Sequence, residues 1–116
     1  MKKNLNEIIE EYVVNAENHG KATNSGNYKL ANKCHDKIIM MLKEIRNFGK
    51  EGDEALLKLI EHKDDSVKCW AATHSLKYDK KRTVKILKGL STKNGPVAFD
   101  AEIVLEEWNA GTLDIP

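Results

Sequence analysis

Residues 56–76, LLKLIEHKDDSVKCWAATHSL, decide the fold that the sequence predicts. Leucine and isoleucine recur at helical spacing in the first part of this stretch, which indicates an amphipathic helix. The acidic turn at residues 64–66 is suited to cap a second helix, expected from about Val67 to Tyr78. The small pair Ala71 and Ala72 lets neighbouring helices approach closely. The stretch therefore predicts two helices joined by a short turn.

Two further helices are predicted before this stretch. Asn4 is placed to cap the first, with Glu7 three residues later as in a capping box. Residues 19–26 are polar and flanked by glycines, so they are interpreted as a loop or a frayed helix end. A near-heptad stripe then predicts a long helix that ends at Gly49. Its members are Leu30, Cys34, Ile38, Met41, Ile45 and Phe48.

The region after the central stretch predicts two more helices. Asp79 is suited to cap one of them, and Pro96 stands where proline favours the first turn of the other. Gly111 ends this last helix, and Asp53 marks the start of the helix before the acidic turn. No segment alternates with the period of two that strands show. We therefore predict an all-α fold of about six helices in successive antiparallel pairs.

The length of 116 residues predicts one domain, 1–116. Its expected parts are an N-terminal helical pair (1–50), a central repeat (53–78), a final pair (79–111) and a loose tail (112–116). No stretch has the uninterrupted apolar run of a signal peptide or a membrane span. The two cysteines, Cys34 and Cys69, lie among apolar residues and predict buried free thiols rather than a disulfide. These features together predict a cytoplasmic protein.

The central stretch resembles a HEAT repeat, the helix–turn–helix unit of α-solenoids. A single repeat cannot bury its apolar face alone, so neighbouring helices are expected to stack on it. The resemblance implies a short α-solenoid, a right-handed superhelix of HEAT-like pairs. Lys68 stands where many HEAT repeats carry arginine, and lysine lacks the forked donor geometry of arginine.

Residues 53–113 also resemble a small bacterial family whose members end in a helix of the form A-x-x-x-L-x-x-W-x-x-G. Ala101, Leu105, Trp108 and Gly111 match that form, and the segment 70–72 matches the central helix of the family. Some small HEAT-like proteins of this kind are immunity proteins of polymorphic or contact-dependent growth inhibition toxins. The resemblance therefore implies a non-catalytic protein whose partner is the C-terminal domain of a cognate toxin.

Catalytic and metal chemistry have little support in the sequence. Cysteines and histidines are present, but no spacing matches a zinc site, and no glycine elbow surrounds a nucleophile. The adjacent carboxylates Glu106 and Glu107 point about 100° apart on a helix and do not converge on one atom. The two tryptophans recur with apolar neighbours, which favours core packing. We therefore expect no enzyme activity, no metal and no cofactor.

Charge is distributed unevenly although the whole chain carries only +1. Residues 77–93 hold seven lysines or arginines and one acid, a net charge of +6. Residues 94–116 hold five acids and no base, a net charge of −5. One interpretation is that the last two helices compensate each other, and the other is a bipolar surface that docks a protein.

The leading prediction is an immunity protein that blocks a toxin by stoichiometric occlusion. The predicted contacts lie on the last helix and at the end of the helix expected from Val67 to Tyr78: Lys77, Tyr78, Asp100, Glu102, Glu106 and Glu107. The alternative is a nucleic-acid-binding module that uses residues 77–93, where Lys81, Lys85 and Lys88 share a helix face. No aromatic residue interleaves with these lysines, which weakens a base-stacking groove. A small HEAT-like DNA glycosylase would need several more repeats than this length provides.

Overall fold

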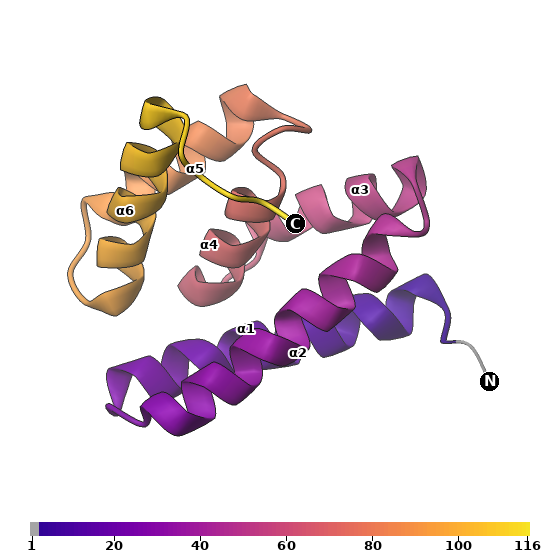
Figure 1. The fold of residues 1–116 in the computed structure, drawn as a ribbon, viewed down its shortest axis with the longest axis horizontal. Coiled ribbons are helices and arrows are strands. Elements are labelled where there is room, and N and C mark those ends of the chain that lie inside the picture. Colours follow the sequence, from indigo (N-terminus) through magenta and orange to yellow (C-terminus); the bar gives the residue numbers. More distant parts are fainter. Residues whose placement is uncertain (1–2) are drawn as a thin grey trace.

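The computed structural model describes residues 3–116 and is all-α. Its elements are α1 (Leu5–Asn24), α2 (Tyr28–Arg46), α3 (Lys50–Lys58), the short 3-10 helix η1 (Leu59–Glu61), α4 (Asp65–His74), α5 (Lys80–Ser91) and α6 (Pro96–Ala110). No strand occurs among these residues. The prediction of six α-helices in a repeat-like stack is confirmed (Figure 1).

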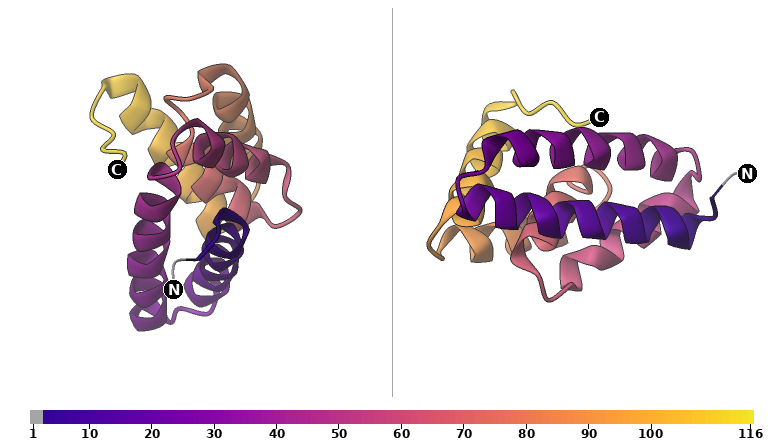
Figure 2. Two further views of the ribbon diagram at one scale, coloured as in Figure 1. Left: turned by 90° about the vertical axis from the view of Figure 1, so that its right-hand side faces the viewer. Right: turned by 90° about the horizontal axis from the view of Figure 1, so that it is seen from below.

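Helices α1 and α2 form a long antiparallel pair that supports the rest of the molecule. Figure 2 shows them side by side, with the shorter helices stacked against the pair. The predicted stripe of α2 packs inward at its centre, where Cys34, Ile38 and Ile45 are buried. Its two outermost members, Leu30 and Phe48, are exposed, because they lie at the ends of the stripe. The pair therefore buries the middle of the predicted stripe and leaves the residues at both of its ends exposed.

Helix α4 is the centre of the fold, since it contacts α1, α3, η1, α5 and α6. Small side chains permit this crowding, and Ala71 and Ala72 are fully buried as the sequence predicted. The crossing with α1 is especially close, because a Cβ on Gly20 would lie 2.7 Å from the Cβ of Ser66. The Ser66 hydroxyl donates to the carbonyl of Ala16 at 2.8 Å and closes this contact.

The predicted caps are present at the helix ends. The side chains of Asn4, Asp64 and Asp79 accept hydrogen bonds from the third residue beyond each of them. Pro96 occupies the first turn of α6, and Gly111 ends that helix with a φ of +74°. These ends depend on residues close together in the chain, which is why the sequence alone identified them.

The loop predicted at 19–26 is wrong for residues 19–24, which continue α1 to Asn24. Gly20 lies within this helix, and its lack of a side chain lets α4 cross α1 closely at this point. Ala22 is buried, and the Thr23 hydroxyl donates to the carbonyl of Gly20 at 2.9 Å. Tertiary contact with α4 thus outweighs the local signal of a glycine in a polar stretch.

Three other boundaries differ from the prediction. Helix α2 ends at Arg46, before the predicted end at Gly49. Helix α3 begins at Lys50 rather than Asp53, so that Glu51 and Asp53 both lie in its first turn. Helix α4 ends at His74 rather than Tyr78, and Ser75 is its C-cap. The chain then turns at residues 75–79, where the amides of Tyr78 and Asp79 both donate to the carbonyl of Ser75.

The core runs between the long pair and the shorter helices. Cys34 and Cys69 are both buried and free, as predicted. The tail is better held than expected, because Leu113 and Ile115 pack against the core. Within residues 3–116, no helix has the length and apolar character needed to cross a membrane.

Candidate protein-binding surface and cleft

Helix α6 presents an acidic outer face. Its inner side carries Ala98 and Ala101, which are buried against the fold. At about 100° of rotation per residue, Glu102 and Glu106 fall on one flank of the exposed face, and Asp100 and Glu107 fall on the other. The four predicted acids of α6 therefore surround one exposed helix face instead of pointing to a common centre.

An aromatic side chain lies in the middle of this face. Phe99 is 62% exposed, one of the most exposed large hydrophobic residues of the described chain. Ile103, one turn later, is half-buried and continues the apolar strip between the acids. Exposed aromatic residues ringed by charge are typical of the centre of a protein interface.

The acids of α6 and the bases of α5 do not compensate each other in pairs. Arg82 of α5 lies 3.8 Å from Glu61 of η1 and 3.9 Å from Asp79, and Lys93 bonds to Asp65 at 2.8 Å. Among residues 3–116, no ion pair joins α5 to α6. The two helices are therefore not joined by direct ion pairs, and the acids of α6 have no cation within ion-pair distance among the described residues.

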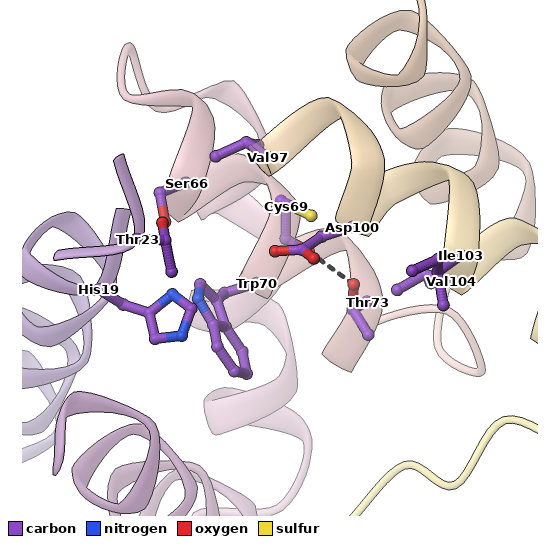
Figure 3. Close-up of a pocket in the computed structure, with 10 residues that line it drawn as sticks. All are labelled: His19, Thr23, Ser66, Cys69, Trp70, Thr73, Val97, Asp100, Ile103 and Val104. Carbon is purple, nitrogen blue, oxygen red and sulfur yellow. Dashed lines mark hydrogen bonds between the residues drawn. The ribbon is translucent and has the colours of Figure 1, made fainter. Parts of the chain in front are cut away.

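A cleft of about 310 Å³ opens where α6 meets α4 and α1. Figure 3 shows His19 and Trp70 at one end, Ile103 and Val104 at the other, and Asp100 between them. Its other lining residues are Thr23, Ser66, Cys69, Thr73 and Val97. The cleft is thus largely apolar, with one carboxylate and no lysine or arginine among its lining residues.

The electrostatics of the cleft are governed by partial burial. Loss of solvation raises the pKa of Asp100 from its ordinary value of 3.8. Burial, and then the neighbouring His35, lowers the pKa of His19, so His19 is neutral at neutral pH. Asp100 is the one acidic side chain among the residues that line this cleft.

Cys69 is not poised as a nucleophile. Burial, and then the Asp100 carboxylate, raises the pKa of its thiol to about 12. A nucleophilic cysteine needs the opposite shift, because the thiolate is the reactive form. Among the described residues, no group of three histidine, cysteine or acidic side chains could hold a metal ion.

On the α1 side of α4, a second set of polar groups is centred on the buried side chains of Tyr12 and His74. The Tyr12 hydroxyl and His74 Nδ1 are hydrogen-bonded at 2.8 Å. Arg46 of α2 donates to the carbonyl of His74 at 2.7 Å and to Asp53 of α3 at 3.1 Å. Burial, and then the Arg46 charge, lowers the pKa of His74 to about 3. This cluster joins four helices and offers no open space to a ligand.

The structure separates the six predicted contact residues into different places. Asp100 lines the cleft, whereas Glu102 and Glu106 lie on the far flank of α6. Lys77 and Tyr78 are exposed in the turn between α4 and α5. Loss of solvation, and then the carboxylates of Glu54 and Asp53 in α3, raise the pKa of Tyr78.

The cleft residues outside α6 were missed by sequence reasoning. Trp70 was assigned to the core, but it also lines the cleft, and its ring meets His19 edge-on with centroids 5.1 Å apart. His19 and Thr23 fell in the predicted loop. In a continuous helix, residues four apart share a face, so His19 and Thr23 point the same way. This relation was overlooked because the segment was interpreted as a loop.

A separate basic groove of about 450 Å³ lies between α4 and α5. Ile60, Ile86 and Leu90 form its apolar part, and its basic residues are Lys68, Arg82, Lys85 and Lys93. None of its lining residues is aromatic. Lys85 is the member of the predicted lysine face that borders this groove.

Comparisons with known proteins support the fold and add no function. No family model matches the chain, and no curated protein matches it. The crystal structure of the protein RPA1889 from Rhodopseudomonas palustris CGA009 is similar, with a TM-score of 0.88 and 18% sequence identity. The match covers 99% of this chain and 96% of that one. At this identity the likeness shows a shared fold alone.

Proposed function

We propose that this chain is a non-catalytic protein-binding module, an immunity protein that neutralises a cognate bacterial toxin. The observation that carries the proposal is the outer face of α6, where exposed Phe99 lies among carboxylates that have no ion-pair partner in the described chain. An apolar centre with a charged rim is the composition expected of a protein-docking surface. The family resemblance in residues 53–113 supplies the class of partner.

The proposed mechanism is stoichiometric occlusion. Phe99 and Ile103 supply apolar contact, and Glu102, Glu106 and Glu107 steer a basic partner and set its orientation. A toxin that acts on nucleic acid has a basic substrate cleft, which these acids would cover. Lys77 and Tyr78 lie in the turn that leads into α5, the helix that packs against α6. The complex would form in the cytoplasm, where such a toxin acts.

The test is co-expression with a candidate toxin domain, sought first in the gene immediately upstream of this one. Phe99→Ala should weaken the complex by about 30-fold or more, the scale of a central hot-spot residue. The triple variant Glu102→Lys, Glu106→Lys and Glu107→Lys should abolish protection of the cells. The measurements are growth rescue and the dissociation constant by calorimetry.

A matched control reverses three exposed acids on the long pair, Glu10, Asp36 and Glu44. This variant has the same net charge as the α6 variant and should protect as the wild type does. If the α6 variant protects equally well, the proposed surface is wrong. The absence of a toxin gene beside this one, together with no binding to any toxin domain, would contradict the function itself.

The basic groove between α4 and α5 favours a second candidate function, the binding of nucleic acid. Lys68 and Lys85 border it, and neither has an ion-pair partner within 3–116. Binding through these cations would weaken steeply as salt increases. Fluorescence anisotropy with labelled duplex and single-stranded oligonucleotides at 50 and 200 mM salt tests this. No affinity at the lower salt rejects the second candidate.

A further inference from the structure

The cleft between α1, α4 and α6 adjoins the proposed binding face. Ile103 belongs to both, since it lines the cleft and lies one helical turn beyond Phe99 on α6. A partner seated on the α6 face would therefore cover the mouth of the cleft. Its volume of about 310 Å³ is at the lower end of ligand pockets, which suits a single long side chain.

The three hydroxyl groups of the cleft already have hydrogen-bond acceptors. Ser66 donates to the carbonyl of Ala16, and Thr23 donates to that of Gly20. Thr73 donates to the carbonyl of Cys69 at 2.7 Å, the bond drawn in Figure 3. These hydroxyls already donate to backbone carbonyls, so their hydrogens are not available to select a ligand.

Asp100 is different from these groups. No hydrogen bond or ion pair to its carboxylate occurs among the described residues. Its surroundings in the cleft include the apolar side chains of Val97, Ile103 and Val104. Asp100 is exposed at the edge of this cleft and has no protein partner, so its carboxylate is free to accept a charge-assisted hydrogen bond from an incoming cation. Its raised pKa agrees with this geometry.

Trp70 provides a second feature that favours a cation. Its indole lines the same cleft as Asp100 and is partly exposed. Aromatic rings attract ammonium and guanidinium groups, and the aliphatic stems of lysine and arginine pack well on apolar walls.

The adjoining hollow, which shares Ser66 and Val97 with the cleft, is lined by three further acids and one lysine: Glu17, Asp64, Asp65 and Lys21.

We propose that this cleft receives the cationic side chain of a lysine or arginine from the protein partner, with its charged group at Asp100 and its stem against Trp70. The inference rests on the proposed function as a protein-binding module and adds a specific anchor to it. The anchor explains how a face with few deep features would select one basic residue of a toxin.

The probe is N-acetyl-arginine amide, with N-acetyl-lysine amide as the second cation. The neutral isostere N-acetyl-citrulline amide has nearly the same shape without the charge. Indole N–H signals of the ¹⁵N-labelled full chain report binding, and Trp108→Phe assigns the two tryptophan signals. We expect saturable shifts of the Trp70 signal with both cations, in the millimolar range of a single side chain, and at least tenfold weaker binding of citrulline.

Asp100→Asn keeps the shape of the side chain and removes its charge. It should weaken arginine binding at least tenfold, while Asp114→Asn, an equal change of charge in the exposed tail, should leave it unchanged. The proposal is overturned if the Trp70 signal does not move, if citrulline binds as well as arginine, or if Asp100→Asn binds as the wild type does. Tighter binding of free putrescine than of either blocked amino acid would also overturn it, because the cleft would then be a small-molecule site.

This experiment separates the inference from the proposed function. A negative result with the blocked amino acids, together with toxin binding that depends on Phe99, rejects the anchor and leaves the immunity function intact. Saturable arginine binding without binding to any toxin domain supports the cleft as a cation site and rejects the partner assigned to it.

Discussion

The Tyr12–His74 cluster and the Asp100–Trp70 cleft lie against the same short helix, α4, and differ in how their polar groups are satisfied. The Tyr12 hydroxyl bonds to His74, and Arg46 bonds to the carbonyl of His74. The carboxylate of Asp100 has no such partner within the described chain. Buried polar groups that have partners hold elements together, whereas a charged group without one is available to a ligand. The comparison assigns stability to the first region and recognition to the second.

The largest expected effect comes from removing the centre of the cluster. Tyr12 has no exposed surface, and Tyr12→Ala should lower the free energy of unfolding by about 3–5 kcal/mol, as for other large aromatic truncations. Tyr12→Phe should cost about 1–3 kcal/mol, because it leaves the buried His74 nitrogen without its partner. Urea denaturation followed by circular dichroism measures both values. A loss below 1 kcal/mol for Tyr12→Ala would contradict a structural role for this cluster.

Acid should destabilise the fold through His74. Its pKa is about 3 in the folded state and near 6.5 when exposed, so the unfolded chain takes up the proton first. Stability is therefore full well above pH 6.5 and declines as the pH falls toward 3. Between pH 6.5 and pH 5 the loss should be about 1.6 kcal/mol, because the unfolded imidazole is half protonated at pH 6.5 and the slope approaches 1.36 kcal/mol per pH unit only below that.

Replacing His74 by glutamine tests the source of this pH dependence. The His74→Gln variant should lose most of the change in stability between pH 6.5 and pH 5, whatever its stability at pH 7. His35→Gln, at an exposed position on α2, should retain the change. An equal slope in wild type and His74→Gln would assign the acid sensitivity to other groups.

The smallest effect on stability is expected at the cleft. A raised pKa means that folding disfavours the ionised form of Asp100, so its contribution to stability improves as the pH falls through that pKa. Asp100→Asn should therefore leave the free energy of unfolding at pH 7 within about 0.5 kcal/mol of wild type, or raise it slightly. A loss above 1 kcal/mol would show that Asp100 is structural and would remove the contrast between the two regions.

Much of the fold could be predicted because its signals are local. The side chains of Asn4, Asp64 and Asp79 cap helices through amides three residues away, and Gly111 ends α6 with a positive φ. The spacing of apolar residues identified the buried centre of α2. Each signal involves residues within about two helical turns, so no knowledge of distant contacts was needed.

The candidate site could be predicted only in part, because three helices build it. Asp100 was identified from its charge, but its position beside Trp70 depends on how α6 crosses α4. His19 and Thr23 were lost when Gly20 was interpreted as a helix breaker, although Gly20 is the point at which α4 crosses α1. The ion-pair partners could not be predicted from the sequence either, because Arg82 and Lys93 pair with Glu61 and Asp65, which lie outside α6.

Sequence by itself determined the all-α class, the capped helix ends and the acidic character of the last helix, because periodicity, capping and charge are properties of neighbouring residues. Tertiary structure alone decided that α1 continues past Gly20, that Phe99 faces solvent and that Asp100 lacks a cation. The physical reason is that close crossing, exposure and ion pairing depend on the distance between segments far apart in the chain, and that distance is set by packing around α4.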